Sequence, residues 1–151
     1  MIITNWKWSE KMKTIITYYT LGGTSKKEAE RIASENENVV ICEVQQKKKY
    51  NILTAFILGC PKAMKRQVVE IKDVQYDLSD FDRIIFVAPI WAGFPVPAFN
   101  AMVNLLREWK EVEIFMCSGG GEAPKSEEGT KKMIQDKNCK LIAYHNIKVS
   151  K

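Results

Sequence analysis

Cysteine and histidine are scarce in this chain, which limits the chemistry that its own side chains can perform. The 151 residues include one histidine, His145, and four cysteines, which are Cys42, Cys60, Cys117 and Cys139. The cysteines are far apart and form no Cys-x-x-Cys pair, so the usual structural zinc patterns are excluded. We therefore expect buried, reduced thiols and no metal site.

Long hydrophobic runs and a recognisable leader are also missing. No apolar run approaches the roughly 20 residues that a membrane-spanning helix requires. Residues 1–12 lack the cationic, apolar and small-residue sections of a secretory signal peptide. We therefore expect a cytoplasmic protein that does not associate with membranes.

Glycine and proline are few, with eight and five residues, while 46% of the chain is hydrophobic. This composition is typical of one globular domain with a sizeable core. The sequence contains no repeat, linker or low-complexity segment. We expect a single domain over residues 13–151, preceded by an N-terminal extension over residues 1–12.

The charge of the chain is basic but not concentrated on one surface. The formal net charge is +5 and the isoelectric point is about 9.0. Because the lysines are spread over separate segments and do not line one predicted helix face, we do not expect nucleic-acid binding. One local cluster brackets the segment between residues 47 and 66. It consists of Lys47, Lys48, Lys49, Lys62, Lys65 and Arg66.

Short apolar runs alternate with helix-like segments along the chain. β-Branched and aromatic runs predict strands over residues 14–19, 39–44, 83–88, 112–117 and 139–149. Apolar residues at helical spacing predict helices over residues 26–34, 96–109 and 126–136. Residues 45–74 are less regular, with an apolar patch at 52–58 and a predicted turn at Gly59-Cys60-Pro61. The alternation predicts an α/β fold in which helices cover both faces of a parallel five-stranded sheet.

Three loops rich in small or hydroxyl-bearing residues follow strands of this predicted sheet. They span residues 20–25, 89–97 and 118–122. Ligands of such sheets bind beyond the carboxyl ends of the strands, where the strand order reverses. We therefore expect the three loops to share one edge and to form a ligand site there.

The first loop, Thr20-Leu21-Gly22-Gly23-Thr24-Ser25, leads from a strand directly into a helix. Such a loop presents unpaired backbone N–H groups, the positive end of the helix dipole and hydroxyl donors to one anion. We interpret it as a phosphate-binding loop. In the second loop, Trp91 offers a flat apolar surface to a ring-shaped ligand, and Gly93 lets the main chain come close to that ligand.

Other phosphate-binding motifs do not match the first loop. A Rossmann domain requires Gly-x-Gly-x-x-Gly, and residues 21–27 lack that pattern although Glu43 has the spacing of the expected acid. A Walker site requires Gly-Lys-Ser/Thr, but here the order is Gly23-Thr24-Ser25-Lys26. A phospho-receiver domain needs acids at the end of the first strand, where this chain has Tyr18 and Tyr19.

The chain resembles the flavodoxin-like family of FMN-binding proteins over residues 13–148. The family's first loop has the form Ser/Thr-x-Thr-Gly-Asn-Thr, which Thr20, Gly23 and Ser25 match in kind. Gly22 replaces a hydroxyl residue of that motif, and Thr24 replaces the asparagine. Residues 76–82 and 88–98 resemble the family's loop beside the isoalloxazine ring. Ser118-Gly119-Gly120-Gly121 resembles its third flavin loop.

This resemblance implies a doubly wound sheet with strand order 2-1-3-4-5 and FMN as the cofactor. It also implies which residues bind that cofactor. They are Thr20, Leu21, Gly22, Gly23, Thr24, Ser25, Pro89, Ile90, Trp91, Ala92, Gly93, Phe94, Ser118, Gly119, Gly120 and Gly121. The chain is then expected to be a redox protein, either an electron carrier or an FMN-dependent reductase. Its partner would be a redox protein or a small-molecule acceptor.

The residues themselves supply no independent acid–base or nucleophilic site. Ser25 and Ser118 lack a histidine base, because His145 falls in the last predicted strand. The cofactor would therefore carry the chemistry, and the basic cluster at 47–66 would favour two-electron reductase chemistry or an acidic partner. The alternative is a flavodoxin-fold interaction module, or an anion-binding module, that has lost flavin. Gly22 and Thr24 motivate that alternative, and the sequence leaves the oligomeric state open.

Overall fold

The protein is described by a computed structural model that covers residues 12–149. The expected N-terminal extension therefore lies outside the described residues, apart from Met12. Within the described range, no helix has both the length and the apolar character needed to cross a membrane.

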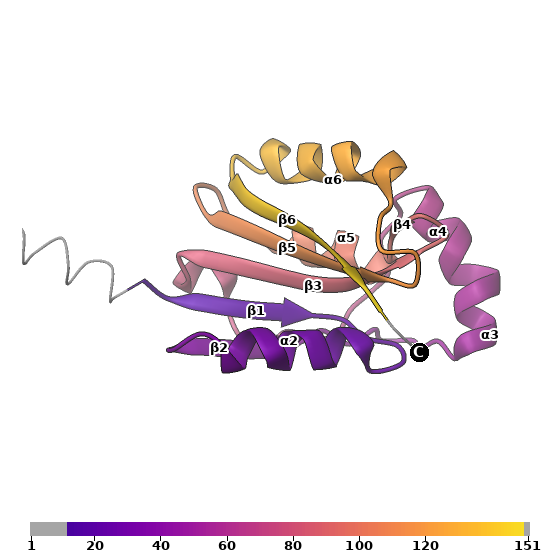
Figure 1. The fold of residues 1–151 in the computed structure, drawn as a ribbon, viewed down its shortest axis with the longest axis horizontal. Coiled ribbons are helices and arrows are strands. Elements are labelled where there is room, and N and C mark those ends of the chain that lie inside the picture. Colours follow the sequence, from indigo (N-terminus) through magenta and orange to yellow (C-terminus); the bar gives the residue numbers. More distant parts are fainter. Residues whose placement is uncertain (1–11, 150–151) are drawn as a thin grey trace, which may run out of the picture.

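A parallel sheet forms the centre of the molecule, with strand order β2-β1-β3-β5-β6 (Figure 1). Its strands are β1 (Thr14–Tyr18), β2 (Val39–Glu43), β3 (Arg83–Trp91), β5 (Glu111–Ser118) and β6 (Lys140–Lys148). Every neighbouring pair along this path is parallel. A two-residue strand, β4 (Phe94–Pro95), pairs antiparallel with β3 and lies off the path. The predicted order 2-1-3-4-5 is confirmed for the five parallel strands.

Helices cover both faces of the sheet, because side chains of each strand alternate between two cores. On one face, Ile16 packs with the buried residues of α2 (Thr24–Ser34). On the other face, Ile15 belongs to a larger core that includes residues of α5 (Pro97–Val103) and α6 (Pro124–Asp136). Figure 1 shows α2 and α6 on opposite sides of the sheet. The predicted doubly wound α/β architecture is therefore confirmed.

Two predicted elements in the middle of the chain have the wrong length. The third strand was expected to end at residue 88, but β3 continues to Trp91. The following helix was expected over residues 96–109, whereas α5 ends at Val103. Beyond it the chain turns, and Trp109 adopts a left-handed backbone conformation with φ 67° and is 81% exposed. A short 3-10 helix, η2 (Leu78–Asp80), precedes β3.

The segment between β2 and β3 was predicted to be irregular with a turn at Gly59-Cys60-Pro61. This prediction is wrong for residues 52–64, whereas residues 45–51 and 65–74 contain no helix and no named strand. Residues 52–64 form consecutive helical pieces: α3 (Ile52–Thr54), the π-helix η1 (Ala55–Gly59) and α4 (Cys60–Met64). Asn51 begins the stretch with a capping box, since its side chain accepts a bond from Thr54 N and the Thr54 hydroxyl accepts one from Asn51 N. Pro61 is accommodated in the first turn of α4, where a missing N–H is tolerated.

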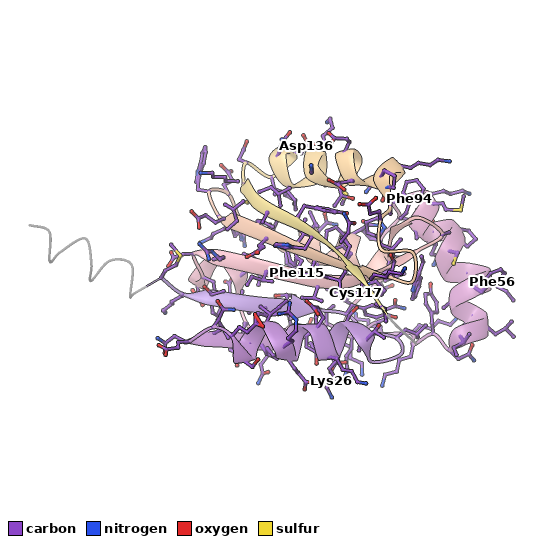
Figure 2. The ribbon with its side chains drawn as sticks, viewed as in Figure 1. Lys26, Phe56, Phe94, Phe115, Cys117 and Asp136 are labelled. Atoms are coloured by element: carbon purple, nitrogen blue, oxygen red, sulfur yellow. The ribbon has the colours of Figure 1, made fainter. Side chains whose placement is uncertain are left out.

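This helical stretch turns its small residues inward and its large apolar residues outward. Ala55, Gly59 and Ala63 are buried. Ile52 is 83% exposed and Phe56 is 74% exposed. In Figure 2, Phe56 projects from the outer side of this stretch. The usual rule that large apolar residues mark the buried face is therefore reversed here.

Candidate functional site

The three predicted loops lie at the carboxyl edge of the sheet. The first is in contact with the second, and the second lies next to the third. Tyr19, at the start of the first loop, donates from its N–H to Val87 O of β3 at 3.1 Å. Its ring packs edge-on against Trp91 with 6.2 Å between centroids. Pro89 of the second loop is the register partner of Cys117, next to the third loop. The expected common edge is thus present.

The first loop forms a tight turn that leads into α2. Gly23 has φ +98°, a conformation that glycine adopts without strain, and its N–H donates to the Thr20 hydroxyl at 2.8 Å. The helix begins at Thr24, two residues earlier than predicted, and no side chain caps it. Its first backbone N–H groups therefore point beyond the helix end, where the helix dipole is positive.

Ser25 carries the most informative polar atom of this loop. Its side chain is fully buried, and its Oγ has no hydrogen-bond partner of good geometry among the described residues. It lies beside the Cys117 thiol: burial raises the pKa of Cys117, and the Ser25 hydroxyl offsets part of that rise. Buried hydroxyls almost always have partners of good geometry. This hydroxyl, beside the Cys117 thiol and the free helix N–H groups, makes the start of α2 a candidate ligand position.

The second segment is a β-hairpin and not the open loop that was predicted. Pro89, Ile90 and Trp91 continue β3, and Ile90 and Trp91 pair with the two residues of β4. Ala92 and Gly93 make the turn with φ 54° and 85°, the combination required by the commonest two-residue hairpin turn. Pro89 is tolerated in this central strand because the register with β1 ends at Val87.

Trp91 lies against aromatic and helical neighbours that the sequence did not associate with it. Its ring is 6.2 Å from Tyr19 and 6.0 Å from Tyr50, measured between centroids. A Cβ placed on Gly59 would lie 2.5 Å from the Trp91 ring, so the π-helix approaches this ring as closely as a glycine allows. Burial, together with the neighbouring Tyr50, raises the pKa of Tyr19 to about 12.

The third loop is held by its serine. The Ser118 hydroxyl accepts a bond from Gly121 N at 3.0 Å, and its carbonyl accepts one from Val149 N at 2.8 Å. Gly121 has φ +86°. Gly119 and Gly120 are exposed, and an added Cβ would meet no atom within 4 Å at either position. The middle of this loop is therefore open to an approaching ligand.

A cavity of about 390 Å³ adjoins the first loop on the side of β2. Tyr19, Thr20 and Gly23 line it from the first loop, and Lys26, Glu43 and Tyr50 are among its other lining residues. Sequence reasoning did not assign Lys26 or Tyr50 to the site. Tyr50 directly follows the basic cluster at residues 47–49, which was the only signal that could have drawn attention to it.

Arg66, counted in the basic cluster, lies between α4 and α6. Its guanidinium donates to Ser126 O at 2.8 Å and to the Thr130 hydroxyl at 3.2 Å. It also lies 5.4 Å from the centroid of the Phe94 ring. Burial lowers the pKa of Arg66. This side chain connects the hairpin to α6 and does not extend toward the first loop.

Replacing Arg66 with methionine should therefore lower the free energy of unfolding by about 1–2 kcal/mol, because two hydrogen bonds from a partly exposed charged group and a cation–π contact are lost while the apolar stem is kept. Urea unfolding measures this. Lys65→Met is the matched control, since it removes the same charge from an exposed neighbour. Equal losses in the two variants would contradict the role given to Arg66.

The histidine and the cysteines offer no independent chemistry at this edge. His145 lies in β6 as predicted, where Nε2 is 2.6 Å from Glu113 Oε2 and the ring stacks on Phe115. Its partners are thus neither Ser25 nor Ser118. All four cysteines are free, and three of them are buried. Among residues 12–149, no group of three or more potential ligands could hold a metal ion.

Several solved structures have an architecture similar to that of this chain. No protein-family model and no curated protein matches the sequence. A flavoprotein from Lactobacillus acidophilus, solved in complex with FMN, is 21% identical, with 88% of this chain and 91% of that chain covered and a TM-score of 0.68. A proposed flavoprotein from Bacteroides uniformis is 19% identical, with 88% and 89% covered and a TM-score of 0.74. The WrbA-like flavodoxin of Agrobacterium tumefaciens is 14% identical, with 86% and 76% covered and a TM-score of 0.57.

Proposed function

We propose that this chain, which has the flavodoxin-like fold, is an FMN-binding redox protein. The observation that carries the proposal is the buried, unpartnered Ser25 hydroxyl at the uncapped N-terminus of α2. A phosphate at this position would receive a hydroxyl bond and backbone N–H bonds together, without any basic side chain. The solved neighbour with FMN has the same fold, which supports this choice of phosphate ligand.

The chain's own residues would have separate roles in holding FMN. Thr20, Ser25 and the first N–H groups of α2 would bind the phosphate. The hairpin at Trp91 and the open glycines of the third loop would flank the ring and exclude water from it. FMN, when bound, would supply the electron transfer, since none of the described side chains forms a nucleophile–base pair at this edge.

The basic surface near the first loop favours a reductase, or a carrier with an acidic partner. Two lysines, Lys26 and Lys49, and one acid, Glu43, line the cavity beside this loop. Arg66 is held at α6, and Lys47 pairs with Glu70 at 3.5 Å. Positive charge near a flavin stabilises its anionic reduced form and so raises the reduction potential. The partner in this proposal is a redox protein or a small-molecule acceptor, and the location is cytoplasmic.

Titration with FMN tests the proposal. Binding at micromolar concentrations should quench flavin fluorescence and raise Tm with increasing FMN, because a ligand that binds only the folded state stabilises it by mass action. FAD and NAD should have much weaker effects, since the first loop is suited to a terminal phosphate. If FMN changed neither the fluorescence nor Tm, the proposal would be wrong.

The alternative is an interaction or anion-binding module of the same fold that has lost flavin. Gly22 favours it, because a glycine at this position removes one hydroxyl that the family's loop provides. The visible spectrum of protein purified without added flavin separates the two functions. Flavin absorption bands support the FMN protein, whereas a colourless protein stabilised by inorganic phosphate but not by FMN supports the module.

A further inference from the structure

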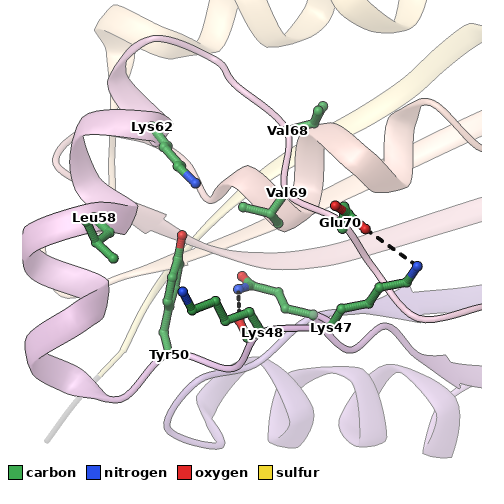
Figure 3. Close-up of a pocket in the computed structure, with 9 residues that line it drawn as sticks. Lys47, Lys48, Tyr50, Leu58, Lys62, Val68, Val69 and Glu70 are labelled. Atoms are coloured by element: carbon green, nitrogen blue, oxygen red, sulfur yellow. Dashed lines mark hydrogen bonds and ion pairs between the residues drawn. The ribbon is translucent and has the colours of Figure 1, made fainter.

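A second cavity, of about 470 Å³, lies beside the first but is separated from the phosphate-binding loop (Figure 3). It is bounded by the segment around residues 46–50, by the helical stretch at Leu58 and Lys62, and by residues 68–70. Gln46 and Tyr50 line both cavities and thus form the wall between them. Neither the fold nor the proposed FMN site accounts for this second space.

The charge of this cavity is positive and incompletely neutralised. Three lysines and one glutamate line it. Lys47 pairs with Glu70 at 3.5 Å, but neither Lys48 nor Lys62 forms an ion pair with any described residue. Figure 3 shows the Lys62 side chain pointing toward Val69 and the Lys48 side chain ending beside the Tyr50 ring. Two ammonium groups that line one cavity without an ion-pair partner among the described residues favour an anionic ligand.

The remaining walls are apolar, with one buried polar atom that lacks a partner. Tyr50, Leu58 and Val69 give the cavity flat and aliphatic surfaces. The Gln46 side chain is only 3% exposed; its Nε2 donates to Lys48 O at 3.0 Å, while its Oε1 has no partner. A buried acceptor without a donor indicates a ligand N–H or O–H group. An inorganic anion would leave both the apolar walls and Gln46 unused.

We infer that this cavity binds an organic anion of the aromatic carboxylate class that carries a hydrogen-bond donor. The carboxylate would lie between Lys48 and Lys62, the ring would pack on Tyr50 and Val69, and the donor would reach Gln46 Oε1. Because Tyr50 also contacts Trp91, such a ligand would lie one side chain from the hairpin. The inference depends on this cavity alone and does not require that FMN binds.

Calorimetric titration of the full chain with three naphthalene probes tests the inference. We expect saturable binding of 2-naphthoate, binding of 6-hydroxy-2-naphthoate about three- to tenfold tighter through its added donor, and clearly weaker binding of neutral 2-naphthalenemethanol. Lys62→Gln should weaken binding of 2-naphthoate about five- to tenfold, and Lys48→Gln should have a similar effect. Lys27→Gln, an equal charge change on the exposed side of α2, should have no effect.

Phe56→Ser identifies binding to the exposed apolar helix face, because Phe56 is 74% exposed and does not line the cavity. Unchanged affinity in this variant supports the cavity. The inference is overturned by any of four results: no saturable binding at millimolar probe, equal affinity for the neutral probe, equal losses in the Lys27 and Lys62 variants, or loss of binding in Phe56→Ser.

Discussion

Replacing Ser25 with alanine should weaken FMN binding by about 1.5–3 kcal/mol, which is roughly 10- to 150-fold in Kd. The Ser25 hydroxyl is buried without a partner at the start of α2, so a bound phosphate would gain a charge-assisted hydrogen bond there. Alanine fills the same space without the hydroxyl and removes an unsatisfied polar atom from the FMN-free protein. Fluorescence titration of the two proteins measures the difference.

Two controls distinguish phosphate binding from loop packing. Riboflavin lacks the phosphate, so its affinity should be the same for the Ser25→Ala variant and the unchanged protein. Thr17→Val replaces another buried hydroxyl that has no partner, on β1 and outside the first loop, and should leave FMN affinity unchanged. If Ser25→Ala weakened riboflavin as much as FMN, Ser25 would be a packing residue of the loop and not a phosphate ligand.

Replacing Gly59 with alanine should lower the free energy of unfolding by about 1–3 kcal/mol, the range for an overpacked core position. The new Cβ would lie 2.5 and 2.9 Å from two atoms of the Trp91 ring and 3.1 Å from Tyr50. Alanine favours helix over glycine by about 1 kcal/mol, so a net loss would show that the clash outweighs helix propensity. Urea unfolding gives the stability, and tryptophan fluorescence reports the displaced ring.

Gly129→Ala is the matched control for this prediction, since Gly129 is also helical and close to another side chain. There the added Cβ would meet Arg66 Nη2 at 2.7 Å, at the end of a long side chain that can shift by rotation about its own bonds, although its hydrogen bonds to α6 would weaken. We expect a clearly smaller loss than at Gly59, because a ring held between tyrosines and a helix cannot move as easily. Equal losses at both glycines would mean that the contact with Trp91 is not rigid.

Local sequence signals predicted the strands that are buried on both faces and the helices that bury one face. The β-branched run at residues 14–19 lies in a sheet covered on both faces, and β1 occupies nearly the same residues. The helix after the first loop was predicted because its buried positions, Ala29 and Ile32, recur at helical spacing. The strand order followed from the family resemblance, and the parallel register confirms it.

In other segments, tertiary contacts determined a structure that differs from the one that the local sequence indicates. Proline normally ends a strand, but Pro89 continues β3 because β1 has already ended beside it. Most of the apolar run at residues 52–58 faces solvent, although apolar residues are usually buried. Its helix instead packs through Gly59, whose lack of a side chain lets the Trp91 ring approach.

The sequence by itself determined the α/β alternation and the turn at residues 20–25 that leads into α2, because both depend on residues adjacent in the chain. Only the tertiary structure decided which distant residues surround that turn. Tyr50 reaches Trp91, and Lys62 reaches the cavity beside Tyr50, through a helical stretch whose position depends on a contact between Gly59 and β3. Such packing brings together residues that are far apart in the chain, so the periodicity of the local sequence does not predict it.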